Sequence, residues 1–243
     1  MTGTGAVSHG IDLTGAEVSL LGKRLLGPVT LNISERRVGI IGRNGSGKST
    51  LLRLIAGLVA PSAGQVRVDG IDPSGDRKGL IARLGILFQN PDHQIIFPIV
   101  EEELAFGLRQ MGLGKVEALA QAKARLVAEG RGHWAGRPVS SLSQGQRQYL
   151  CLLAVLMMEP ATLLLDEPFS GLDIPTARGL AAHLARLSQR LLVVTHDPLV
   201  AQAYDRVIWL EGGLVKGDGT PDAVLPAYLT AMEAADAGPD FGA

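Results

Sequence analysis

Residues 42–50 read GRNGSGKST, a glycine-rich stretch with one lysine and several hydroxyl side chains. Gly42, Gly47, Lys48 and Ser49 fit the spacing G-x-x-x-x-G-K-[ST], in which successive backbone N–H groups cradle phosphate. Lys48 is expected to reach the β- and γ-phosphates, Ser49 to bind Mg²⁺, and Thr50 to lie beside the α-phosphate. The stretch therefore predicts a nucleoside triphosphate site, with contacts from Gly42, Arg43, Asn44, Gly45, Ser46, Gly47, Lys48, Ser49 and Thr50.

Two neighbouring acids form a second candidate for chemistry. Residues 163–168 read LLLDEP, an apolar run that ends in Asp166 and Glu167. At the carboxyl end of a parallel strand, both carboxylates are expected at the edge where the phosphate loop opens. Asp166 is expected to hold Mg²⁺, directly or through water, and Glu167 to polarise the attacking water. Taken alone, the acids would favour an ordinary strand end; the phosphate loop favours the catalytic interpretation.

The elements that must position these residues alternate between β-rich and helical runs, which predicts an α/β fold. Residues 48–56 have the apolar face of a helix, and Gly57 is placed to end it. Two short runs flank EGG and predict a hairpin. The expected strands are 37–41, 65–69, 84–89, 162–166 and 190–195, with the hairpin at 206–210 and 214–216.

A helical block interrupts the strands between residues 90 and 159, with its clearest helices at 101–111 and 116–129. The predicted organisation is one domain over 1–243. Its core comprises 1–90 and 160–229, its helical subdomain is 91–159, and its small, polar tail at 230–243 is expected to be disordered.

Composition narrows the class of partner. Lys and Arg total 23 against 24 for Asp and Glu, a net charge of −1, so no basic nucleic-acid-binding surface is expected. The longest apolar run, 149–158, is far shorter than the ~20 residues that span a bilayer, and the N-terminus lacks a signal-peptide pattern. Cys151 lies in that run and is expected to be a buried thiol. The chain is therefore expected in the cytoplasm, with apolar surface available for a protein partner.

Residues 142–146, LSQGQ, open a predicted helix. Ser143 could simply cap that helix, but a helix N-terminus with a hydroxyl and a glycine N–H also attracts an anion. The pentapeptide resembles the signature of ABC ATPases, which power ABC transporters. The resemblance implies that the signature of one subunit covers the γ-phosphate bound by another, here with Leu142, Ser143, Gln144, Gly145 and Gln146.

Three further residues fit the same resemblance. Gln89 resembles the Q-loop glutamine that touches Mg²⁺ or the attacking water, His196 the switch histidine, and Asp173 the D-loop aspartate at the dimer interface. The resemblance spans residues 10–220 and implies a P-loop NTPase: a RecA-like core with an antiparallel β subdomain and an inserted helical signature subdomain. It implies hydrolysis of ATP with Mg²⁺ between two ATPase subunits. A homodimer is expected because one chain carries every catalytic element; a heterodimer stays open.

One departure from that family concerns the base. No aromatic residue precedes Phe88, whereas the family stacks an aromatic residue on adenine. The aligned stretch offers Leu20 or Leu21, and Leu21 is assigned to the base contact. Because an aliphatic contact lacks a stacking term, weaker discrimination between ATP and GTP is expected.

The segment after Gln89, FQNPDHQIIFPIVEEELAFGLRQMGL, resembles the ATPases of energy-coupling factor (ECF) importers. The resemblance implies a groove for coupling helices of a transmembrane T component, whose arginines would meet acids. The acids could equally serve the dipole of their own helix. The groove residues so assigned are Ile95, Ile96, Phe97, Glu101, Glu102 and Glu103.

Few residues follow the hairpin, and in this respect the chain resembles the compact ATPases of biotin importers. In those importers a membrane S component binds the substrate. The implied location is the cytoplasmic face of the membrane, as a peripheral subunit. A cobalt or nickel importer and a soluble ATPase of iron–sulfur cluster assembly remain alternatives. A DNA-repair ATPase is disfavoured because the chain shows neither heptads nor a basic surface.

Overall fold

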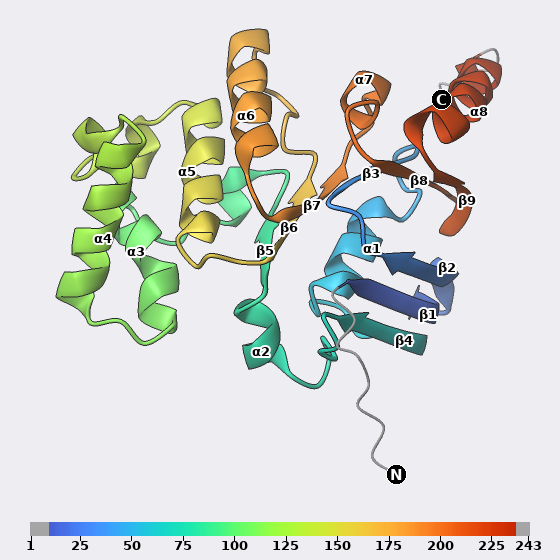
Figure 1. Ribbon diagram of the computed structural model, residues 1–243, viewed down its shortest axis with the longest axis horizontal. Coiled ribbons are helices and arrows are strands. Elements are labelled where there is room, and N and C mark those ends of the chain that lie inside the picture. The colour runs from blue at the N-terminus through green and yellow to red at the C-terminus, as the bar shows by residue number, and fades with distance from the viewer. Residues whose placement is uncertain (1–9, 237–243) are drawn as a thin grey trace. The chain divides into compact units, whose positions relative to one another are not determined.

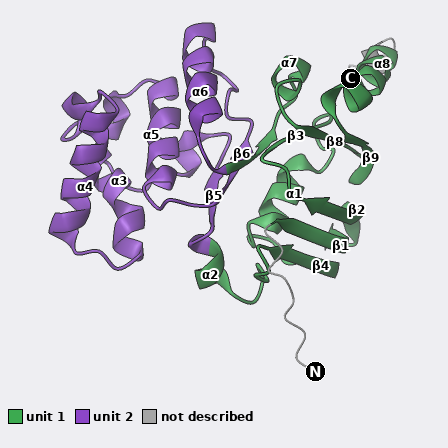
Figure 2. Cartoon of the chain, viewed as in Figure 1, with its two compact units in different colours: residues 1–80, 190–243 green, residues 81–189 purple. Residues whose placement is uncertain are grey.

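The computed structural model describes residues 10–236, which form two compact units (Figures 1 and 2). Of the described residues, 10–80 and 190–236 belong to the first unit and 81–189 to the second. The described elements of the first unit are β1 (Ile11–Leu20), β2 (Lys23–Ile33), β3 (Arg37–Ile41), α1 (Lys48–Ile55), β4 (Ala63–Val68), α2 (Arg77–Ile81), β7 (Arg190–Val194), α7 (Pro198–Ala201), β8 (Arg206–Glu211), β9 (Leu214–Gly219) and α8 (Pro221–Asp236), where α2 ends one residue into the second unit.

The first unit is built on two sets of strands. An antiparallel sheet has the order β2-β1-β4, with Ile11 opposite Ile33 on one side and Val68 on the other. In the other set, β3 pairs in parallel with β7 and β8, and β9 returns antiparallel to β8. Four of the five residues of β3 are buried, as expected for a central parallel strand. This strand leads directly into the phosphate loop and α1.

The second unit combines the parallel pair β5 (Leu84–Leu87) and β6 (Thr162–Asp166) with helices. The helices α3 (Val100–Gln110), α4 (Lys115–Ala128) and α5 (Gln144–Leu156) lie side by side in Figure 1. They enclose an apolar core that includes Leu104, Leu126, Trp134 and Leu150. The remaining elements are η1 (Pro91–His93), η2 (Gly132–Trp134), η3 (Val139–Ser141) and α6 (Ile174–Arg186).

Most element predictions agree with this structure. The strands predicted at 37–41 and 162–166 have those bounds, the β8–β9 hairpin forms, and the two helices of the helical block lie within one or two residues of their predicted ends. The disorder predicted from residue 230 is wrong for 230–236, which continue α8 to Asp236. The alanine-rich sequence there has high helix propensity, and α8 is anchored by Tyr228 packing on Trp209. Residues 237–243 lie outside the described part of the chain.

Candidate nucleotide and signature sites

The phosphate loop follows β3 and ends at Gly47, the N-cap of α1. Gly47 has a φ of 101°, which favours glycine. Gly42 cannot carry a side chain, because a Cβ there would lie 2.1 Å from the carbonyl oxygen of Leu210. The loop is also tied to the β8–β9 turn, where the Gly213 N–H donates to the Ser46 carbonyl at 3.1 Å. The loop is thus held against the β8–β9 turn by backbone that leaves no room for a side chain at Gly42.

Lys48 begins α1 and is only 6% exposed. Its ammonium donates to the carbonyls of Gly42, at 2.7 Å, and Arg43, at 2.9 Å. The Ser46 hydroxyl is buried and has no hydrogen-bond partner among the described residues. A buried unsatisfied hydroxyl is costly, and a bound anion would supply its partner. A fixed cation, this hydroxyl and a helix N-terminus together fit a polyphosphate ligand.

Two of the predicted catalytic residues meet in the second unit. Gln89 follows β5 and Glu167 follows β6, and the Gln89 amide Nε2 lies 3.3 Å from the Glu167 carboxylate Oε2. Glu167 has a φ of 46°, a left-handed conformation that costs about 1–3 kcal/mol and concentrates at functional sites. Parallel pairing of β5 with β6 therefore places a carboxylate and an amide together at one strand edge, where a water molecule could be held.

The residues predicted to hold Mg²⁺ are Ser49, Gln89 and Asp166. Asp166 ends β6 and is 7% exposed, while Ser49 lies in the first turn of α1. Hydroxyl, amide and carboxylate oxygens are the hard ligands that Mg²⁺ uses together with substrate phosphates. Within residues 10–236, no group of three or more His, Cys, Asp and Glu side chains could hold a metal by itself. The oxygen donors of the three predicted residues are of the type that a nucleotide-bound Mg²⁺ uses.

The signature residues form the N-terminus of α5. Ser143 is the N-cap: its hydroxyl accepts from the Gln146 N–H at 3.3 Å, and the Gln146 side chain accepts from the Ser143 N–H at 2.9 Å. The hydroxyl hydrogen of Ser143 remains a possible donor to an anion. Gly145 has a packing role as well, because a Cβ there would lie 2.5 Å from Thr176 on α6. Ser143 therefore caps α5, and its hydroxyl hydrogen can still be donated to an anion.

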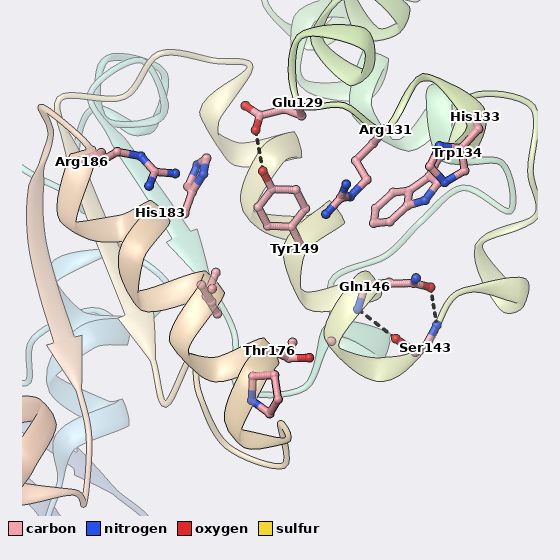
Figure 3. Close-up of a pocket in the computed structure, with 14 residues that line it drawn as sticks. Glu129, Arg131, His133, Trp134, Ser143, Gln146, Tyr149, Thr176, His183 and Arg186 are labelled. Carbon is pink, nitrogen blue, oxygen red and sulfur yellow. Dashed lines mark hydrogen bonds between the residues drawn. The ribbon is translucent and has the colours of Figure 1, made fainter.

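Figure 3 shows a cavity of about 760 Å³ beside this helix end. Tyr149 projects from α5 between Glu129 and His183, and its hydroxyl donates to the Glu129 carboxylate at 2.5 Å. Burial is the main cause that raises the pKa of Tyr149, with the Glu129 hydrogen bond second. Sequence reasoning missed this cavity, whose lining residues come from distant segments: Glu129, Arg131, His133, Trp134, Ser143, Gly145, Gln146, Tyr149, Pro175, Thr176, Gly179, Leu180, His183 and Arg186.

The other predicted nucleotide residues lie on loops. Asp173 caps α6 by accepting from the Thr176 N–H at 2.9 Å. Hydrogen bonding by the Thr176 side chain, and next by its backbone N–H, lowers the pKa of Asp173. His196 is exposed between β7 and α7. Leu21 is 99% exposed in the β1–β2 turn with a φ of 50°. An exposed leucine in such a strained turn position is available to cover a flat ligand.

Some residues of the predicted partner groove are exposed, and others contact residues of their own chain. Ile96 is 63% exposed, whereas Ile95 packs against the helical core. The ring of Phe97 lies 5.4 Å from that of Phe106. Glu101 pairs with Lys123 at 3.5 Å. For Glu103, both a partner's arginines and the dipole of its own helix were open; it is buried and accepts hydrogen bonds from backbone N–H groups of its own chain.

Comparison with known proteins assigns the class. Residues 26–170 match the family model described as ABC transporter, and the chain belongs to this family of transporter ATPases. It is 52% identical over 224 residues to the biotin transport ATP-binding protein BioM of Rhodobacter capsulatus, covering 92% of this chain and 96% of that one. It is 35% identical over 209 residues to the energy-coupling factor transporter ATP-binding protein EcfA1 of Ligilactobacillus salivarius, covering 84% and 74%.

Two solved structures share the fold. One is cbiO1 from Clostridium perfringens, described as part of the ABC transporter complex cbiONQ, with a TM-score of 0.77, 29% identity and coverage of 92% and 93%. The other is the ATP-binding cassette MJ0796, a dimer in a post-hydrolysis state bound to ADP and Pi, with a TM-score of 0.75, 28% identity and coverage of 87% and 98%. The predicted P-loop ABC fold is thereby confirmed, and the chain is an ATPase that binds ATP.

Proposed function

We propose that the chain is the ATP-hydrolysing subunit of an ECF-type importer whose substrate is biotin. The observation that carries this proposal is the 52% identity to BioM across nearly the full length of both chains. The segment after Gln89 supports it, because this segment carries the resemblance to ECF ATPases, and its Ile96 is 63% exposed.

In the proposed mechanism two copies bind two ATP molecules at their interface. Each site combines the phosphate loop and Lys48 of one chain with Ser143 of the partner subunit. Glu167, which is held near Gln89, orients and deprotonates the attacking water. His196 contacts the γ-phosphate, and Asp173 lies at the interface between the copies.

Mg²⁺, when bound, neutralises charge on the phosphates. Ser49, Gln89 and Asp166 would hold it. Lys48 adds a fixed positive charge, since two loop carbonyls anchor its ammonium. Preorganised groups of this kind stabilise developing charge without reorganisation.

The proposed partners are a T component, which docks at the groove, and an S component, which binds biotin. Among residues 10–236, no helix has the length and hydropathy required to cross a membrane. We therefore propose peripheral attachment, through the T component, to the cytoplasmic face of the membrane. The residues proposed to face the T component are Ile95, Ile96, Phe97, Glu101 and Glu102.

Biotin uptake by vesicles containing the complex tests the proposal. Uptake should require ATP on the side of the membrane where the ATPase is attached. Lys48→Ala should abolish uptake, because the phosphates lose their fixed cation. ATP-dependent uptake of cobalt or nickel without biotin uptake would contradict biotin as the substrate and indicate a metal importer. Co-purification of the chain with a soluble scaffold alone would contradict an importer.

A further inference from the structure

The segment 88–97 connects Gln89 to the proposed partner groove and contains only the short η1 turn. Side chains tie its first half to the fold. The Gln94 side chain accepts from the Phe88 N–H at 3.1 Å and donates to the Ile86 carbonyl at 3.3 Å. Asn90 accepts from the Asp92 N–H at 2.9 Å. These bonds substitute for the backbone ladders that strands and helices would provide.

The second half of the segment is held by Glu103 on α3. Its carboxylate oxygen Oε2 accepts from the Ile96 N–H at 2.9 Å and from the Phe97 N–H at 2.8 Å. Glu103 is only 5% exposed. A buried carboxylate is unfavourable unless hydrogen bonds compensate for lost hydration. These two charge-assisted bonds therefore both stabilise the acid and fix two successive amides.

The fixed backbone determines where three consecutive apolar side chains go. Ile95 packs against the helical core and Phe97 packs on Phe106, while Ile96 between them is exposed. A partner that covered Ile96 would remove its apolar side chain from water, which is favourable. The conformation that exposes Ile96 is the one that Glu103 holds.

We propose that Glu103 is a positioning residue: it clamps Ile96 and Phe97 so that Ile96 is presented to the membrane partner, and it is not itself a ligand for the partner's arginines. The identity of the partner rests on the proposed function. Because the same segment begins at Gln89, beside Glu167, the clamp also joins the partner-facing end of the segment to its catalytic end.

Hydrogen–deuterium exchange of the full chain tests the clamp directly. Glu103→Gln keeps the side-chain shape but removes the charge, so exchange at Ile96 and Phe97 should become about tenfold faster, since the bonds lose their charge assistance. Glu103→Asp retains the charge, so its exchange rate at Ile96 and Phe97 should lie between those of the wild type and Glu103→Gln. It serves as the second variant if Glu103→Gln disrupts folding. Glu117→Gln, an exposed acid on α4, is the matched control and should change nothing. Unchanged exchange in both Glu103 variants would overturn the clamp.

Binding to the T component that co-purifies with the wild-type chain tests the consequence. Glu103→Gln should weaken that complex by about tenfold, with unchanged ATP affinity and with partial recovery in Glu103→Asp, because the loss comes from misplacement of Ile96. If a Glu103 variant with faster exchange at Ile96 and Phe97 bound the T component as tightly as the wild type, the positioning role would be overturned. Failure of the wild-type chain to bind any T component would instead overturn the proposed function, while the exchange experiment would still decide on the clamp.

Discussion

Glu167 is the residue that we propose to activate the attacking water, and its surroundings support that proposal. It follows a fully buried strand, adopts a left-handed backbone conformation, and lies within reach of the Gln89 amide. A side chain held this way can orient a water molecule only if its position is maintained despite the strain.

Glu167→Gln should therefore leave ATP binding intact and slow hydrolysis by at least about 100-fold, the usual contribution of a general base. Steady-state ATPase rates and nucleotide affinity measured together check this. Glu117→Gln on α4 makes the same chemical change at an exposed position and should retain the wild-type rate. Normal turnover in Glu167→Gln would show that another group activates the water.

Leu21 is the residue assigned to the contact with the nucleotide base, where the family has an aromatic residue. Leu21→Tyr should improve selectivity for ATP over GTP by roughly two- to tenfold, because aromatic contacts add about 0.5–1.5 kcal/mol. The ratio of kcat/KM for the two nucleotides is the measurement. Leu20→Tyr is the comparison, since Leu20 is the other exposed leucine at this turn. Equal ratios in the wild type and both variants would remove the assignment of the base to this turn.

Cys151 shows a residue whose chemistry the fold suppresses. Burial, aided by the nearby carboxylates of Glu103 and Asp92, raises the pKa of its thiol to about 12. The thiolate is the reactive form, so the native protein should resist alkylation at pH 8 and become labelled only after denaturation. Rapid labelling of the native protein would show that this part of α5 opens.

At the scale of elements, α5 is fixed by Tyr149. Its hydroxyl bonds Glu129, which also pairs with Arg125, and its ring meets Trp134 and His183 edge-on. One side chain thus connects the signature helix to α4, η2 and α6.

Tyr149→Phe keeps the ring and removes the bond to Glu129. We expect a loss of about 1.5–3 kcal/mol, the value of a hydrogen bond to a charged group, measured by denaturant unfolding. Tyr228→Phe is the matched control, because within residues 10–236 the Tyr228 hydroxyl has no recorded hydrogen bond and should lose less. Equal losses in the two variants would mean that Glu129 does not hold α5.

The elements predicted best from the sequence are those with the simplest patterns. The strands at 37–41 and 162–166 are apolar runs with clear ends, and the phosphate loop follows from glycine spacing. The long strands β1 and β2 were not predicted individually, because their pairing is irregular and the apolar alternation shifts with it. The cavity around Tyr149 could not be predicted, because it depends on tertiary packing of residues far apart in sequence. The engagement of Glu103 is local, with amides six and seven residues earlier, but the run of three acids at 101–103 does not indicate which of them turns toward this segment.

At the scale of the whole molecule, each described unit holds part of the proposed ATPase machinery. Lys48 belongs to the first unit, whereas Glu167 and Ser143 belong to the second. The proposed arrangement adds the signature of a second copy to complete each site. MJ0796, a relative in fold, is itself dimeric with ADP and Pi bound.

The most direct measurement is a structure of the Glu167→Gln chain with ATP and Mg²⁺. Slow hydrolysis should trap a homodimer in which Lys48 of one chain and Ser143 of the partner subunit both contact the same γ-phosphate. A nucleotide-loaded chain that stays monomeric, or a dimer whose Ser143 lies away from the bound nucleotide, would contradict the shared site on which the account depends.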